Sequence, residues 1–163
     1  MKTKLLATLF SLSTLAGCTF NDATNDIYLI PEGYEGYVYA FYNVKNAPEV
    51  KKEGDYEIYT INKEGYFVTS TPDMDYGTIT DKYYYVDTNG QRTKIDEECI
   101  RGIGTGGYES DPDSANKIDI KYTGVEVKKS GCSQEFAEFG KGMGTENLDL
   151  VLSEVTEKYY GVN

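Results

Sequence analysis

Aromatic residues that alternate with small or polar residues are the feature that most limits the folds open to this chain. The sequence has 16 Tyr and 6 Phe but no Trp. Such alternation is typical of β-strands, in which successive side chains point to opposite faces. Expected strands, separated by turn residues, cover 27–30, 36–42, 56–61, 66–70, 82–86, 91–95, 117–122 and 125–128.

The spacing of these strands predicts how they pair. Residues 56–70 are expected to form one hairpin and residues 82–95 another, around Asp87–Gly90. The strand over 36–42 carries apolar groups on both faces, which indicates a central position. Short strands at this spacing predict a mainly β fold, an antiparallel β-sandwich-like domain over residues 27–163.

Two segments interrupt the strand pattern. Residues 102–116 hold four glycines and an Asp-Pro-Asp-Ser sequence, which favours a flexible loop. Near the C-terminus, Leu148, Val151 and Val155 recur at helical spacing with acids between them. This pattern predicts one C-terminal amphipathic helix over residues 146–159.

The N-terminus is typical of an export signal. A short basic start at Lys2 and Lys4 precedes an uncharged apolar stretch, and Leu15-Ala16-Gly17-Cys18 ends it. This ending resembles the bacterial lipobox, which implies a signal peptide over residues 1–17, diacylglycerol on the Cys18 sulfur and a tether over 18–26. An ordinary apolar helix with a chance cysteine is the alternative. The lipobox reading places the body in the periplasm or outside the cell, on the outer membrane if the organism is Gram-negative.

Lipidation of Cys18 would leave two of the three cysteines. Cys99 and Cys132 are an even pair in an exported chain, and an oxidising compartment favours a disulfide between them. Two free buried thiols are the alternative. The cysteines form no C-x-x-C motif, so neither a redox centre nor a zinc knuckle is expected.

Composition excludes several kinds of function. The chain has no His, which removes imidazole-based triads and the common zinc hydrolase sites. Its formal charge of −11 argues against nucleic acid as a partner. Acidic segments at 73–75, 96–98 and 111–113 lack the EF-hand pattern, so no metal or cofactor is expected. No catalytic residue is assigned, and the chain is not expected to be an enzyme.

Several motifs together are similar to an uncharacterised family of bacterial exported or lipid-anchored domains. They are Ile30-Pro31-Glu32-Gly33-Tyr34-Glu35-Gly36, Asn46-Ala47-Pro48, Tyr76-Gly77, Asp81-Lys82-Tyr83-Tyr84-Tyr85-Val86 and Gly104-Thr105-Gly106. The resemblance covers residues 27–108 and leaves 109–163 as an extension. It implies an exported location and a β fold, and it carries no activity.

The most suggestive candidate site is a set of tyrosines. A ring with a hydroxyl suits the surface of a protein or glycan partner, although the same rings can fill a core. The candidate binding surface comprises Tyr34, Tyr37, Tyr39, Tyr83, Tyr84 and Tyr85.

These observations favour a lipid-anchored envelope lipoprotein that acts as a non-catalytic binding module for an envelope protein or glycan. One special case is an acidic inhibitor or immunity lipoprotein against an envelope-targeting hydrolase. The alternative class is a glycan hydrolase that uses carboxylates alone. A concave site with two convergent carboxylates, at least one of them buried, would favour the enzyme.

Overall fold

The computed structural model describes residues 23–110, 113, 117–138 and 147–162. The predicted signal peptide, Cys18 and the first part of the predicted tether lie outside the described residues. In chain order the elements are β1 (Asp26–Pro31), β2 (Gly36–Tyr42), β3 (Lys51–Glu53), β4 (Tyr56–Thr60), β5 (Tyr66–Val68), β6 (Lys82–Val86), β7 (Arg92–Lys94), the 3-10 turn η1 (Glu97–Cys99), β8 (Ile100–Glu109), β9 (Asp119–Val127), α1 (Gln134–Ala137) and α2 (Leu148–Tyr160). Among these, no helix is long and apolar enough to span a membrane.

The strands form two sheets, which confirms the mainly β fold with a C-terminal helix. The first sheet has the order β3-β4-β1-β6-β7, and the second has the order β5-β2-β9-β8. Both sheets are mixed: β1 runs parallel to β4 and β6, and β2 runs parallel to β5, whereas the other pairs are antiparallel. Parallel pairing brings residues that are far apart in the sequence to the same end of a sheet.

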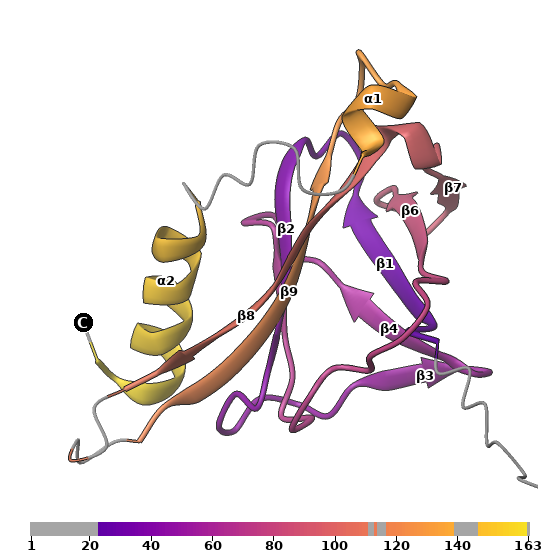
Figure 1. Cartoon of the computed structure of the whole chain (residues 1–163). Helices are drawn as coiled ribbons and strands as arrows, with labels where there is room; N and C mark the ends of the chain where they lie inside the picture. Colours follow the sequence, from indigo (N-terminus) through magenta and orange to yellow (C-terminus); the bar gives the residue numbers. More distant parts are fainter. Residues whose placement is uncertain (1–22, 111–112, 114–116, 139–146, 163) are drawn as a thin grey trace, which may run out of the picture.

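Three layers result, with the second sheet between the first sheet and α2 (Figure 1). Val38, Ala40 and Tyr42 of β2 face the first sheet in one hydrophobic cluster. Tyr39 and Phe41 face the opposite way, in a cluster with residues of α2. This arrangement confirms the central position predicted for β2 and explains why both of its faces are apolar.

Helix α2 covers the outer face of the second sheet with the residues that the periodicity predicted. Leu148, Val151 and Val155 are buried, whereas Leu150 is 71% exposed on the other side of the helix. The helix ends at Tyr160, and Gly161 caps it with a φ of 68° and an N–H that donates to the carbonyl of Glu157 at 3.0 Å. A left-handed residue at this position ends the helix, and glycine adopts it without a steric cost.

One of the two predicted hairpins is confirmed and the other is wrong. β6 and β7 pair antiparallel around a turn in which Asp87 Oδ1 accepts from the backbone N–H groups of Asn89 and Gln91. β4 and β5 do not pair, because the chain crosses from the first sheet to the second between them. The Gly65 carbonyl at the end of this crossing accepts from the Tyr39 N–H at 2.9 Å, which starts the pairing of β5 with β2.

The glycine-rich loop predicted over residues 102–116 is also wrong for its first half. Residues up to Glu109 continue β8, which pairs along β9 with a register shift between Gly102 and Gly104. A Cβ on Gly106 would lie 2.4 Å from the hydroxyl oxygen of Tyr122. The glycine there permits close packing against a ring across the strand pair, which sequence alone does not distinguish from flexibility. On the partner strand, the two segments predicted at 117–122 and 125–128 form the single strand β9.

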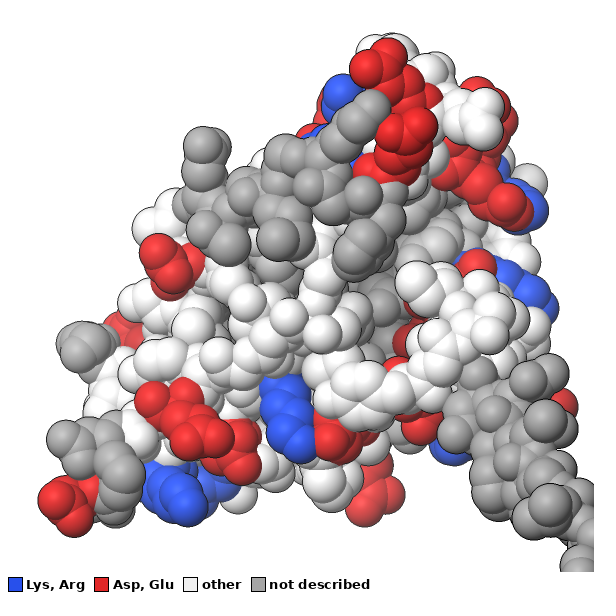
Figure 2. All heavy atoms as spheres, in the orientation of Figure 1, with Lys and Arg blue, Asp and Glu red and all other residues white. Residues whose placement is uncertain are grey.

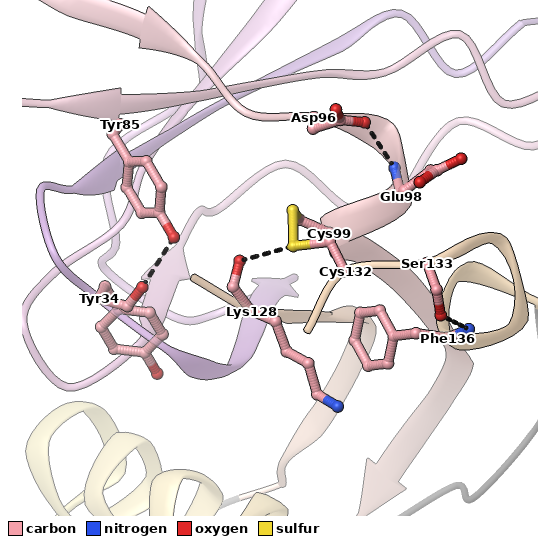
Figure 3. Close-up of a disulfide and its surroundings, with 9 residues drawn as sticks. All are labelled: Tyr34, Tyr85, Asp96, Glu98, Cys99, Lys128, Cys132, Ser133 and Phe136. Atoms are coloured by element: carbon pink, nitrogen blue, oxygen red, sulfur yellow. Dashed lines mark hydrogen bonds between the residues drawn. A yellow bond between two sulfur atoms is a disulfide. The ribbon is translucent and has the colours of Figure 1, made fainter. Parts of the chain in front are cut away.

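The predicted disulfide is present and joins η1 to the segment before α1 (Figure 3). Cys99 and Cys132 have Cα atoms 4.5 Å apart. Next to it, the ring of Phe136 is buried under the Lys128 ammonium, whose Nζ is 4.2 Å from the ring centroid. The Ser133 hydroxyl caps α1 by accepting from the Phe136 N–H at 3.1 Å. The disulfide therefore fixes a small cap, η1 with α1, at one end of the molecule.

Candidate functional site: a carboxylate-lined cavity between the sheets

Three acids lie side by side on the inner face of the first sheet. Asp26 begins β1 and is in register with Glu57 of β4. Asp81 stands one residue before Lys82, the register partner of Ile27 on the other side of β1. The Asp26 N–H donates to Asp81 Oδ1 at 3.2 Å. Because β1, β4 and β6 are parallel, the starts of all three strands bring their acids to the same end of the sheet.

A row of three tyrosines lies two residues further along the same strands. Tyr28 is in register with Tyr59 on one side and with Tyr83 on the other. Its ring meets the Tyr59 ring edge-on at a centroid distance of 5.1 Å and stacks on the Tyr83 ring at 4.8 Å. The three rings hold one another in place, and they form an aromatic wall directly beside the row of acids.

The hydroxyl of Tyr59 connects the acids to the core. It lies 3.0 Å from Asp26 Oδ1 and 3.1 Å from Glu57 Oε2, and it accepts from the Tyr42 hydroxyl at 2.9 Å. Because a phenol carries one proton, Tyr59 donates to one of the two carboxyl groups at a time. Tyr59 therefore links both carboxyl groups to the buried Tyr42 of the core.

Burial and neighbouring charge act together on the two aspartates. Asp26 is only 4% exposed, and burial raises its pKa to about 8, with the charge of Asp81 adding to the effect and the Tyr59 hydrogen bond opposing it. Burial also raises the pKa of Asp81, against the hydrogen bonds that it accepts from the Thr24 hydroxyl and the Asp26 N–H. Burial therefore favours the protonated form of Asp26, and a raised pKa of this kind is typical of functional carboxyl groups.

Glu57 differs from its two neighbours because it has a basic partner. Lys52 Nζ of β3 lies 3.3 Å from Glu57 Oε1. Within the described part of the chain, no ion pair includes Asp26 or Asp81. The two aspartates thus depend on protonation, hydrogen bonds or an added cation to offset their charge.

Asp26 and Asp81 line a cavity of about 470 Å³ between the two sheets. Tyr28 and Tyr83 share their wall, and the opposite wall comes from Gly102, Gly104, Thr105, Gly124 and Val125 of β8 and β9. Small residues there leave the space open. The volume lies within the range of small-molecule sites.

The rim of the cavity is both apolar and acidic. Ile79 is 67% exposed and Tyr76 is 58% exposed, and both belong to the loop between β5 and β6 that borders the cavity. Asp75 of the same loop and Glu97 of η1 complete the acidic lining. Figure 2 shows acidic side chains gathered over η1 and α1, the end of the molecule that borders the cavity at Glu97 and Ala137.

A shallower hollow continues from this rim and shares Met74, Tyr76 and Thr105 with the cavity. Its basic residue, Lys121, lies 2.5 Å from Asp73 and is already paired. Among the described residues, no group of three or more Asp, Glu or Cys side chains is suited to holding a metal ion.

The six tyrosines predicted as a binding surface do not form one surface. Tyr39 is 1% exposed in the core under α2, because β2 is covered on both faces. Tyr37 packs against the same core, and Tyr84 lies on the face of β6 opposite to Tyr83. Of the six, Tyr83 lines the cavity.

Tyr34 and Tyr85 hold the turn between β1 and β2. The Tyr85 hydroxyl donates to the Tyr34 carbonyl at 3.0 Å (Figure 3). The Tyr34 hydroxyl in turn donates to the carbonyl of Tyr37. Both rings pack against the core between the sheets. These contacts give Tyr34 and Tyr85 a role in stabilising the fold, and a binding role is not needed to explain them.

A repeated tripeptide could have indicated the site from the sequence. An acid, one intervening residue and a tyrosine occur at Asp26-Ile27-Tyr28, Glu57-Ile58-Tyr59 and Asp81-Lys82-Tyr83. These three strands are the ones that pair in parallel register. The tripeptides predict a shared site only if the parallel pairing of these strands is known. The antiparallel hairpins expected from the sequence do not predict that pairing.

Comparison with known proteins places the chain in a family of unknown function. A model for a family of unknown function, DUF6843, matches residues 22–136. The matched region extends beyond residue 108 and includes β8, β9 and both disulfide cysteines. A 2.75 Å crystal structure of a "putative lipoprotein" from Bacillus anthracis is 35% identical, with a TM-score of 0.74 over 85% of this chain and 99% of that chain. The search of curated proteins gave no match.

Proposed function

We propose that this chain, which belongs to the family of unknown function DUF6843, is a lipid-anchored binding protein of the cell envelope whose ligand enters the cavity between its two sheets. Two observations support the anchor. The chain carries Leu15-Ala16-Gly17-Cys18 after an apolar segment, and a relative at 35% identity is named a "putative lipoprotein". Two or three acyl chains on Cys18 would hold the body firmly at a membrane surface.

One observation carries the binding role: one wall of the cavity holds two adjacent carboxyl groups that have no basic partner among the described residues, and its rim is apolar and exposed. Asp26 and Asp81 are neighbours on parallel strands, so they approach a ligand from the same side. Ile79 and Tyr76 at the rim add apolar surface that a partner could cover. Binding pockets for small molecules are usually lined by apolar side chains together with a few polar groups.

A pull-down from envelope extract tests this proposal, with residues 19–163 as bait at low and at high salt. Both hydrophobic clusters lie between Tyr28 and Val162, so this body keeps the whole described core. Thr105→Trp fills the cavity mouth without a change of charge, and Thr60→Trp is the matched control on an exposed position of β4. We expect a ligand or partner that Thr105→Trp loses and Thr60→Trp retains. Equal recovery with both variants would place binding elsewhere and overturn the proposal.

A second candidate, a glycan hydrolase that uses carboxylates alone, is favoured by the same cavity. Asp26 and Asp81 converge in a concave site, and the raised pKa of Asp26 would suit a general acid. Against it, the two acids of such hydrolases flank the bond that is cleaved, whereas these two share one wall. Release of reducing ends from envelope glycan by the wild-type body, lost in Asp26→Asn, would favour the hydrolase over the binding module.

A further inference from the structure

The charges around the cavity indicate what kind of ligand it can take. Four carboxylic acids line it, Asp26, Asp75, Asp81 and Glu97, and its described lining contains neither Lys nor Arg. Glu97 is paired with Lys94 at 3.0 Å on the molecular surface. The aspartates of the inner wall lack such a partner within the described residues, so this wall offers no positive charge to an anion.

Other acids close to the cavity have a basic partner, whereas within the described residues Asp26 and Asp81 have none. Glu57, in the same row, has Lys52, and Asp73 near the rim has Lys121. Burying two adjacent carboxyl groups without a base costs free energy, and a cation that enters the cavity would recover part of it. Buried, closely spaced carboxyl groups of this kind are common at binding and catalytic sites.

The apolar part of the cavity limits the ligand further. Tyr83, stacked on Tyr28, offers an aromatic wall beside the aspartates, and Ile100 and Val125 line the cavity as well. Rings beside carboxylates suit an organic cation, through cation–π attraction and through burial of its carbon chain. A bare metal ion would leave the apolar lining unused, and the described residues hold no group of three ligands for one.

We propose that the cavity binds a primary ammonium group carried on a short apolar chain, with Asp81 and Asp26 accepting its hydrogen bonds and Tyr83, Ile79 and Tyr76 covering its carbon chain. This assignment rests on the proposed binding function and specifies its ligand class. An ammonium group has three donors, which matches the carboxyl oxygens of the two adjacent aspartates. A quaternary ammonium would have the charge but no donors.

Calorimetric titration of residues 19–163 with a matched set of six-carbon probes tests the proposal. The probes are hexylamine, hexyltrimethylammonium, hexan-1-ol and hexanoate. We expect hexylamine to bind at least about tenfold more tightly than each of the other three, since they lack the charge, the donors or both. Asp81→Asn should weaken hexylamine binding by about tenfold or more. Asp149→Asn removes the same charge from the exposed face of α2 and should change it by less than about twofold.

Three binding patterns, besides a failure of hexylamine to bind, would overturn the ammonium assignment. They are equal binding of hexanol and hexylamine, equal binding of the trimethylammonium probe, and hexylamine binding that Asp81→Asn leaves unchanged. If hexylamine fails to bind while Thr105→Trp still abolishes the pull-down, the ligand class is wrong and the binding function stands. If Thr105→Trp leaves the pull-down intact, the proposed function itself fails.

Discussion

Asp26 is a buried carboxyl group whose pKa is raised by its surroundings. It is buried at the start of β1, next to Asp81 and under the Tyr59 hydroxyl. A carboxyl group in this position binds a proton more tightly than it does in the unfolded chain, so folding and protonation are linked. The stability of the protein should therefore depend on pH in a direction opposite to that of most salt-bridged acids.

The direction follows from the raised pKa of about 8, against 3.8 for an ordinary aspartate. The contribution is fully present below about pH 4, and it is lost as the pH rises toward 8, because the unfolded chain releases a proton that the folded chain retains. We expect the melting temperature of the wild type to fall between pH 5 and pH 8. In Asp26→Asn, which cannot titrate, the fall should be smaller. Thermal melts across this range measure both, and parallel curves for the two proteins would contradict the assignment.

At the residue scale, the sequence predicted some roles and missed others for one physical reason. The disulfide between Cys99 and Cys132 is confirmed, because an even number of cysteines in an oxidising compartment is enough to predict it. The six tyrosines, predicted as a surface because a ring with a hydroxyl suits a partner, lie instead on different faces, since successive residues of a strand point to opposite sides. The aspartates of the cavity were not singled out, because their grouping depends on a register between β1 and β6, which are 50 residues apart in the chain.

At the scale of elements, the cap formed by η1 and α1 depends on the disulfide. The cap contributes Glu97 and Ala137 to the rim of the cavity. The bridge joins residues 33 positions apart, and the chain-entropy model gives it about 3 to 4 kcal/mol of stability.

Replacing both cysteines tests this role. We expect Cys99→Ser with Cys132→Ser to lower the free energy of unfolding by about 3 kcal/mol in chemical denaturation, because the unfolded chain gains freedom. The reduced wild type should show the same loss and serves as the control. A double variant as stable as the oxidised wild type would show that the cap needs no covalent link.

Helix α2 is the element that its own sequence specifies best. Its apolar spacing, its position against an aromatic face and its glycine C-cap all agree. The predicted start at residue 146 falls outside the described residues, and the end is one residue later than predicted, at Tyr160. Sheet pairing was harder to predict, because hairpin turns and sheet-crossing turns use the same residues, as Asn62–Gly65 shows.

Gly161→Ala should shorten this helix from its end. The left-handed φ of 68° costs an alanine about 1 kcal/mol, although a Cβ there would meet nothing within 4 Å. Chemical denaturation should show a loss of about this size, with Ser153→Ala on the exposed face of α2 as the control. A Gly161→Ala variant with unchanged stability would contradict the role of this cap.

At the scale of the whole molecule, the proposed lipid anchor would hold the binding body at a membrane surface. The name of the relative, "putative lipoprotein", is consistent with the proposed anchor. Intact-mass measurement of the native product should give a chain that begins at Cys18 and carries diacylglycerol, recovered with membranes. A product that retains residues 1–17 without lipid, in the soluble fraction, would contradict the anchor while leaving the cavity unaffected.

Photo-crosslinking in intact cells tests the central claim, that the cavity between the sheets is where this protein meets its ligand. A photoreactive side chain is placed at Ile79 on the rim, and in a matched variant at Leu150 on α2; both positions are exposed and apolar, at 67% and 71%. We predict an adduct from position 79 and none from position 150. Adducts from position 150 alone, or from neither position, would contradict the claim.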